Sequence, residues 1–144
     1  MMQRVFLVCT VWALASMANA GNPDDTMTSE QIVHRFVEVF NAHDVDRMLE
    51  MVTDDVQWLS VDGDDIAVEA SGKAQLRSGM TDYFASCTSC KSRLVHVFST
   101  ADRVSALEEA SYETDSGLQT QRSLSVYEFS GSLIKRVYYF PTEK

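Results

Sequence analysis

The chain has 144 residues, of which 12 are lysine or arginine and 21 are aspartate or glutamate, so its formal charge at pH 7 is −9. Nucleic-acid binding and adsorption to anionic lipid both depend on clustered cations. The composition therefore argues against both kinds of partner. The length is that of one domain with its own hydrophobic core.

The first 20 residues have the pattern of an export signal. Arg4 is followed by an apolar block, residues 5–17, and then by the small-residue site Ala18-Asn19-Ala20. The block is shorter than the roughly 20 residues that cross a bilayer. We expect cleavage after Ala20, export to the periplasm or the medium, and no membrane attachment afterwards. An uncleaved anchor or a buried N-terminal helix is the alternative. Residues 21–27, rich in Gly, Asn, Pro and Asp, predict a flexible leader.

Three helices are predicted from apolar residues at helical spacing. The first follows a capping box formed by Thr28 and Gln31 and extends to residue 40. The second, capped by Asp44, covers residues 45–52, and the third covers residues 71–87, capped by Ser71. Helices this short are not stable alone, so the first two must share a partner surface.

Alternating apolar and polar residues predict strands at 56–61, 94–98, 104–114, 119–129 and 133–140. The last three follow one another through turns that contain Gly and Ser, which is typical of an antiparallel meander. Residues 62–65 read as a turn, since they lack the full ligand set of a calcium loop. Helices that precede strands indicate an α+β fold and not an α/β fold.

Two cysteines, Cys87 and Cys90, remain after the predicted cleavage and form a C-x-x-C pair. Redox enzymes place such a pair at a helix N-terminus beside a βαβ unit, whereas this pair follows a helix. The three histidines lack the spacing of a zinc site, so we expect no metal. In an exported chain the pair predicts a local disulfide, with two free thiols as the alternative.

Three stretches resemble the nuclear transport factor 2-like superfamily, and its SnoaL-like branch in particular. They are FNAHDVDRMLEMVTDDVQW at residues 40–58, Ser71-Gly72-Lys73, and VYEFSGSLIKRVYYFP at residues 126–141. The resemblance covers residues 28–141. It implies a cone-shaped, curved antiparallel or mixed sheet with three helices around a pocket. The family includes isomerases, cyclases, dehydratases, epoxide hydrolases and non-catalytic binding or dimerisation modules. It therefore implies no cofactor, allows a homodimer, and leaves the activity open.

The resemblance argues against ketosteroid isomerase activity. Those enzymes use a tyrosine and a protonated aspartate as an oxyanion hole and a second aspartate as base. Matching along the chain places these three positions at Phe36, at Ser125, and at Ser60 or its neighbour. Phenylalanine and serine supply neither a proton-abstracting carboxylate nor an acidic donor.

The same matching indicates which residues face the pocket. Strand alternation puts Ser123, Ser125 and Tyr127 on one face, which the resemblance assigns to the pocket. On the preceding strand the matching turns Glu109 inward, as a general acid or base. A register slip of one residue would turn it outward. The candidate ligand pocket consists of Phe36, Trp58, Ser60, Ser125, Tyr127 and Tyr139.

Two functional hypotheses follow. The first is an exported module that binds a small, neutral, mainly hydrophobic molecule, because an acidic protein repels anions. The second is a cofactor-independent isomerase, cyclase or dehydratase with Glu109 or a histidine as base. A buried glutamate within reach of Tyr or His side-chain tips would favour the enzyme, whereas an apolar or filled cone would favour binding or a structural role.

Overall fold

The computed structural model describes residues 27–142, so the predicted signal peptide and almost all of the predicted leader lie outside the described residues. Three helices and six strands make up this part of the chain. The helices are α1 (Ser29–Asn41), α2 (Val45–Glu50) and α3 (Lys73–Ser86). The strands are β1 (Val52–Asp62), β2 (Asp65–Ser71), β3 (Lys91–Ser99), β4 (Arg103–Thr114), β5 (Gly117–Ser130) and β6 (Leu133–Tyr139).

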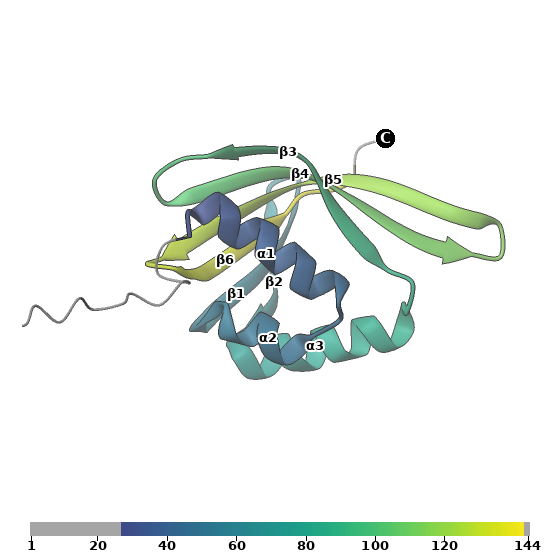
Figure 1. Ribbon diagram of the computed structural model, residues 1–144, viewed down its shortest axis with the longest axis horizontal. Coiled ribbons are helices and arrows are strands. Elements are labelled where there is room, and N and C mark those ends of the chain that lie inside the picture. Colours follow the sequence, from purple (N-terminus) through teal and green to yellow (C-terminus); the bar gives the residue numbers. More distant parts are fainter. Residues whose placement is uncertain (1–26, 143–144) are drawn as a thin grey trace, which may run out of the picture.

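The six strands form one curved sheet in the order β2-β1-β6-β5-β4-β3. β1 and β6 are parallel, and all other neighbours are antiparallel. The helices lie together on one side of the sheet, and the β4–β5 hairpin extends past them (Figure 1). Irregular pairing after Trp58, Leu94 and Glu128 increases the local bend of three strands. The expected α+β fold, a mixed curved sheet with three helices, is confirmed.

The predicted caps of the first two helices are present. Thr28 and Gln31 exchange side-chain to backbone hydrogen bonds of 2.8 and 3.3 Å, which completes the capping box of α1. Between α1 and α2 the chain turns at His43, whose φ is 55°. Asp44 then accepts a hydrogen bond from the backbone N–H of Arg47 and starts α2.

The main differences from the sequence prediction concern α2, β2 and α3. α2 ends at Glu50, because Val52 is fully buried as the first residue of β1 and pairs with Ile134 of β6. β2 was not predicted; it is an edge strand with exposed residues along most of its length. α3 begins after Gly72, with no side-chain cap from Ser71, because the chain leaves β2 through a glycine with a φ of 82°.

The hydrophobic core lies between the helices and the inner face of the sheet. Phe36 of α1, Met48 of α2 and Leu76 of α3 are each at most 2% exposed. They pack against inward residues of the sheet such as Tyr127 and Val137, both fully buried. Val126 lies half-buried on the outer face, because its neighbour Tyr127 takes the inward position.

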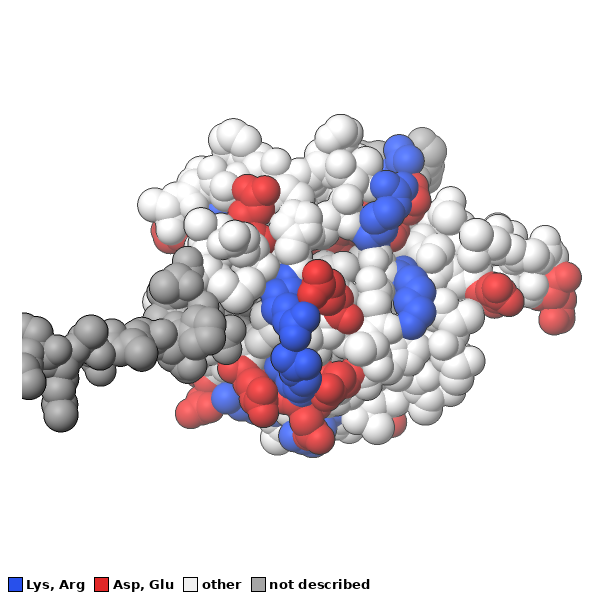
Figure 2. All heavy atoms as spheres, in the orientation of Figure 1, with Lys and Arg blue, Asp and Glu red and all other residues white. Residues whose placement is uncertain are grey.

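Charged side chains of both signs are interspersed on the face that carries α1 and α2 (Figure 2). The exposed ion pairs of the protein include Arg35–Glu38 and Arg77–Asp46, with N···O distances of 2.8 and 2.6 Å. Exposed pairs of this kind contribute little to stability. Within residues 27–142, no helix has both the length and the apolar character needed to cross a membrane.

A candidate pocket with a buried carboxyl group

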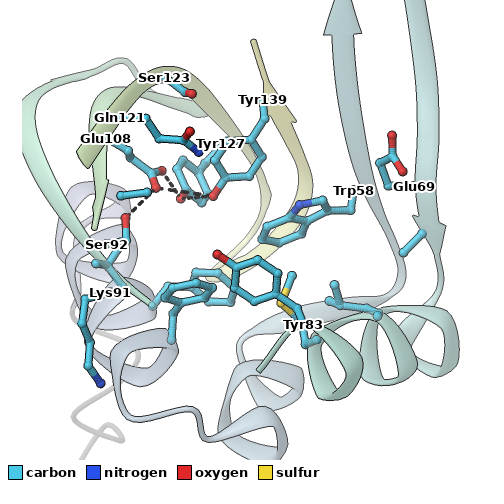
Figure 3. Close-up of a pocket in the computed structure, with 18 residues that line it drawn as sticks. Trp58, Glu69, Tyr83, Lys91, Ser92, Glu108, Gln121, Ser123, Tyr127 and Tyr139 are labelled. Atoms are coloured by element: carbon cyan, nitrogen blue, oxygen red, sulfur yellow. Dashed lines mark hydrogen bonds between the residues drawn. The ribbon is translucent and has the colours of Figure 1, made fainter. Parts of the chain in front are cut away.

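A cavity of about 470 Å³ lies between the helices and the inner face of the sheet (Figure 3). Its walls are mainly aromatic, and several of the rings are in contact with one another. Trp58 of β1 lies with its ring centroid 5.5 Å from that of Tyr139 on β6 and 6.1 Å from that of Phe36 on α1. Residues with polar side chains around the cavity include Glu69, Lys91, Gln121 and Ser123. The cavity has the size and lining of a small-molecule site.

Glu108 of β4 reaches this cavity from the sheet and is only 6% exposed. Its Oε1 accepts hydrogen bonds from the hydroxyls of Ser125 and Tyr127, at 2.6 and 2.5 Å. Its Oε2 accepts one from Ser92 at 3.0 Å and a long one from Tyr139 at 3.5 Å. Hydroxyl-to-oxygen bonds are usually 2.5–3.0 Å, so Oε2 retains acceptor capacity on the side of Tyr139.

The register of the sheet explains why these groups meet. Side chains two residues apart on a strand point to the same face. Glu108 pairs with Ser123 of β5, so Ser125 and Tyr127 share its face. Ser125 in turn pairs with Tyr139 of β6, which brings the second phenol to the same place.

All four groups that contact Glu108 are neutral hydroxyls. Within the described part of the chain, no Lys, Arg or His side chain forms an ion pair with Glu108, so its charge is not neutralised by the protein. Burial, and next the charge of Glu108, raise the pKa of Tyr127 and of Tyr139 well above the usual 10. Both phenols therefore stay protonated at neutral pH and remain hydrogen-bond donors.

Glu109 does not face the pocket, so its predicted inward orientation is wrong. The register is one residue off, which exchanges the faces of the strand. Glu109 lies on the outer face of the sheet, where Arg93 and Arg122 approach its two oxygens at 2.6 and 2.8 Å. Hydrogen bonds from Arg93 and Arg122 lower its pKa. Glu109 therefore has no part in the chemistry of the cavity.

Of the predicted pocket residues, Phe36, Trp58, Tyr127 and Tyr139 line the cavity. Ser125 lies behind the wall, fully buried, and reaches the cavity only through its hydrogen bond to Glu108.

Ser60 is a second correction, because it is not among the residues that line the cavity. It lies beyond Trp58 along β1, and its hydroxyl donates to Glu69 at 2.6 Å.

The sequence prediction missed Glu108 and Ser92. A usable signal was present, because Ala106 and Ala110 flank Glu108 at a spacing of two residues. Small side chains on both sides of a carboxyl leave room for a cavity, whereas Leu107 and Ser111, which flank Glu109, share its face.

No histidine lines the cavity in the described residues, so the alternative base of the sequence hypothesis is absent from it. His34 and His96 are exposed. The His43 ring stacks on Phe84 with centroids 4.2 Å apart, and its Nε2 lies 3.0 Å from the carbonyl oxygen of Cys90. Residues 27–142 contain no group of three or more side chains arranged to hold a metal ion.

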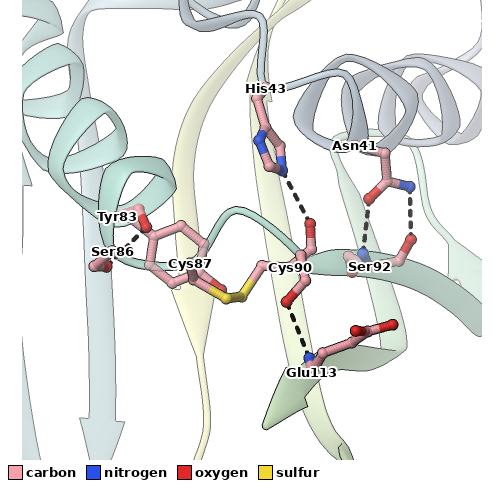
Figure 4. The surroundings of a disulfide bond; sticks show 9 residues. Asn41, His43, Tyr83, Ser86, Cys87, Cys90, Ser92 and Glu113 are labelled. Carbon is pink, nitrogen blue, oxygen red and sulfur yellow. Dashed lines mark hydrogen bonds between the residues drawn. A yellow bond between two sulfur atoms is a disulfide. The ribbon is translucent and has the colours of Figure 1, made fainter. Parts of the chain in front are cut away.

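Cys87 and Cys90 form a disulfide that joins the end of α3 to the start of β3 (Figure 4). Beside it, the side-chain amide of Asn41 donates to the carbonyl oxygen of Ser92 at 2.8 Å. The backbone N–H of Ser92 donates back to the amide oxygen of Asn41 at 2.7 Å. The end of α1 and the disulfide thus hold the segment that presents Ser92 to Glu108.

Solved structures with the same fold include several of low sequence identity. An uncharacterised cystatin-fold protein from Novosphingobium aromaticivorans is 24% identical with a TM-score of 0.70, over 80% of this chain and 99% of that one. A SnoaL-like polyketide cyclase from Agrobacterium tumefaciens is 18% identical with a TM-score of 0.67, over 82% and 93%. An epoxide hydrolase/cyclase-like enzyme with a role in pyran ring formation in the polyether salinomycin is 18% identical with a TM-score of 0.65, over 78% and 88%.

No curated protein matches the chain. The family model of the SnoaL-like domain matches residues 33–137, which is more than half of the chain and includes every residue that contacts Glu108 except Tyr139. The predicted resemblance is therefore confirmed, and the chain belongs to the SnoaL-like domain family of the nuclear transport factor 2-like superfamily.

Proposed function

We propose that this protein is an exported binding protein whose cone takes a small, mainly hydrophobic molecule without negative charge. The observation that carries the proposal is the cavity of about 470 Å³, which has aromatic walls and one buried carboxylate at its inner end. Apolar walls supply affinity by removing ligand surface from water, and one polar group fixes the orientation. The export part of the proposal rests on the signal-peptide pattern of residues 1–20 alone.

Charge decides against an anionic ligand. Glu108 and Glu69 are both among the residues around the cavity. The only cationic side chain among the described lining residues is Lys91, and its ammonium group donates to the backbone carbonyl of Asn41. A second negative charge beside the buried Glu108 would be repelled at low dielectric.

A second candidate function is general acid–base catalysis by Glu108, of the isomerase, cyclase or dehydratase kind. The open acceptor position on Oε2 favours it, because a base needs a lone pair within reach of the proton that it removes. Two of the proteins with similar structures are a SnoaL-like polyketide cyclase and an epoxide hydrolase/cyclase-like enzyme, and the second candidate function is of this broad kind.

Binding can be tested by filling the cavity. Gly79 of α3 lines it, and a Cβ atom placed there meets no heavy atom within 4 Å. Gly79→Leu should weaken binding of a neutral apolar probe, 1-naphthalenemethanol, by at least tenfold in isothermal titration calorimetry, since leucine takes space that the probe needs. The stability should not fall, because a helical glycine is replaced by a better helix former.

The matched control is Ser78→Leu, at an exposed neighbouring position that does not line the cavity, which should leave the Kd unchanged. Equal binding by the wild type and Gly79→Leu, or no binding at all by the wild type, would contradict the proposal.

Catalysis is tested by replacing each of the two adjacent glutamates, Glu108 and Glu109, with glutamine. For any turnover found with the exported protein, Glu108→Gln should lower kcat at least tenfold, the low end for loss of an acid–base group. Glu109→Gln removes a carboxylate one residue away on the other face and should leave kcat unchanged. Full activity of Glu108→Gln would exclude Glu108 as the base.

Export is tested by intact mass. The secreted or periplasmic protein should begin at Gly21, the residue after the predicted cleavage site. A mature protein that retains residues 1–20 would contradict the export proposal and leave the pocket proposal untouched.

A further inference from the structure

Among residues 27–142, no cationic side chain pairs with the carboxylate of Glu108, although the site is otherwise well satisfied. Its oxygens contact four hydroxyls, which can share a negative charge by hydrogen bonding but cannot neutralise it. Its sequence neighbour Glu109 shows the contrast, because two arginines bind that carboxylate on the outer face. A buried charge is costly unless a partner of opposite sign is present. The cavity is the open side from which such a partner can come.

The walls next to Glu108 suit a cation. Tyr139 contacts Oε2 through its hydroxyl, and its ring lies 5.5 Å from that of Trp58. The ring centroid of Phe36 lies 6.1 Å from that of Trp58 and 6.3 Å from that of Tyr127. The four aromatic rings of Phe36, Trp58, Tyr127 and Tyr139 therefore form the wall of the cavity beside Glu108. The faces of aromatic rings carry partial negative charge and attract ammonium groups, most strongly where water is excluded.

We propose that the ligand of this pocket is a protonated organic amine with a hydrophobic body, whose N–H group donates a hydrogen bond to Oε2 of Glu108. The inference rests on the proposed binding function and specifies its ligand class. The ammonium supplies the positive charge that the protein does not provide to Glu108. Its N–H group takes the acceptor position that Tyr139 fills only at 3.5 Å. The hydrophobic body lies against Trp58 and the apolar lining from α1 and α3.

The amine class also follows from what the other lining groups can do. Lys91 already donates to a backbone carbonyl at the end of α1, and it is in none of the ion pairs of the described residues. A neutral alcohol could donate to the same Oε2 but would leave the charge uncompensated. A carboxylate would add a second negative charge. The predicted preference is therefore amine over alcohol over acid.

The test uses the full chain and three probes with one ring system: 1-naphthylmethylamine, 1-naphthalenemethanol and 1-naphthoate, at neutral pH, where the alkyl amine is protonated. Isothermal titration calorimetry should give a Kd for the amine at least tenfold lower than for the alcohol, and the acid should bind most weakly. A Kd for the alcohol equal to or lower than that of the amine would overturn the inference.

Substitution of Glu108 tests whether this residue causes the preference for the amine over the alcohol. Glu108→Gln should weaken the amine at least tenfold and change the alcohol by less than threefold, because only the amine depends on the charge. Glu109→Gln is the matched control and should change neither. Loss of amine preference in Glu109→Gln, or its retention in Glu108→Gln, would overturn the assignment. If Glu108→Gln does not fold, the probe series on the unaltered protein still decides.

The role of the N–H group is tested with the trimethylammonium analogue of the amine, which keeps the charge and has no N–H. It should bind more weakly than the amine, and equal or tighter binding would overturn the proposed hydrogen bond to Oε2. The experiment distinguishes a failure of the proposed binding function from a failure of the proposed amine ligand. If the alcohol does not bind, the binding function fails, whereas if the alcohol and the amine bind alike, the binding function stands and the amine inference fails.

Discussion

The two faces of the β4–β5 hairpin hold glutamates in opposite electrostatic settings. On the outer face, Glu109 pairs with Arg93 and Arg122, and Glu128 pairs with Arg103 and Arg136. On the inner face, the side chains that Glu108 contacts in the described part of the chain are all neutral hydroxyls. The arginines already neutralise the outer carboxylates, so these carboxylates do not need a cationic ligand. The inner carboxylate has no such partner among the described residues, and our proposals for ligand binding and catalysis therefore concern the inner face.

The comparison predicts that large effects on stability come from the inner face. Phe36→Ala should lower the free energy of unfolding by about 3–5 kcal/mol, through lost contacts and a residual cavity, because Phe36 is 1% exposed. Phe98→Ala on the edge strand β3 should cost less than about 0.5 kcal/mol, because Phe98 is 71% exposed. Urea unfolding followed by circular dichroism measures both. Similar losses at the two positions would contradict the assignment of the core to the inner face.

The next largest effect concerns the two adjacent glutamates. Glu108→Ala removes the acceptor of four hydroxyls and should cost about 1–3 kcal/mol of stability, the typical price of unsatisfied buried polar groups. Glu109→Ala should cost clearly less, since its arginines remain in contact with water. The same urea experiment compares them. A larger loss for Glu109→Ala would reverse the proposed roles of the two faces.

A smaller effect is expected at the edge of the inner layer, where the disulfide ties α3 to β3. Replacing Cys87 and Cys90 with alanine should lower the free energy of unfolding by about 1–2 kcal/mol, because a bond that closes so short a loop restrains the unfolded chain only modestly. The wild type in reductant should match the double variant. No difference between oxidised and reduced wild type would show that the disulfide adds nothing to stability.

The fold was predictable because its signals are repeated along the chain. Helical spacing in α1 and alternation in β4, β5 and β6 each involve many residues, so one misplaced residue does not change the prediction. The face of a single carboxylate has no such redundancy. Glu108 and Glu109 are adjacent, and a shift of one residue exchanges them. Only the pairing of β4 with β3 and β5 decides which of the two meets Ser92 and Ser125.

β2 and the limits of α2 were missed for a related reason. β2 is an edge strand, and even its apolar residues Ile66 and Val68 are 60% and 55% exposed. Because neither face of the strand is consistently buried, its sequence does not show the alternation of apolar and polar residues that predicts a strand. Val52 continues the apolar spacing of α2, yet pairing with β6 draws it into β1. Tertiary contacts overrode local preference at both places.

The smallest predicted effect is the pH dependence contributed by the outer face. For Glu109, hydrogen bonds from Arg93 and Arg122 lower the pKa below the usual 4.5. For Glu128, partial burial opposes the change, but hydrogen bonds from Arg103 and Arg136 outweigh it and lower the pKa as well. Both carboxylates therefore bind protons less readily in the folded state than in the unfolded state. Each contributes stability above pH 4.5 and loses that contribution as the pH falls through its folded pKa.

Removing these carboxylates should flatten the acid side of the stability profile. In the double variant Glu109→Gln, Glu128→Gln, the free energy of unfolding should be lower than in the wild type at about pH 6, and the difference should shrink as the pH falls through the lowered pKa values of the two folded carboxylates. Urea unfolding at a series of pH values measures the difference, which should also shrink in high salt because the arginine partners are exposed. A gap that widens as the pH falls would mean that the arginines do not stabilise the ionised carboxylates. The contrast between the paired outer face and the unpaired Glu108 would then lose its basis.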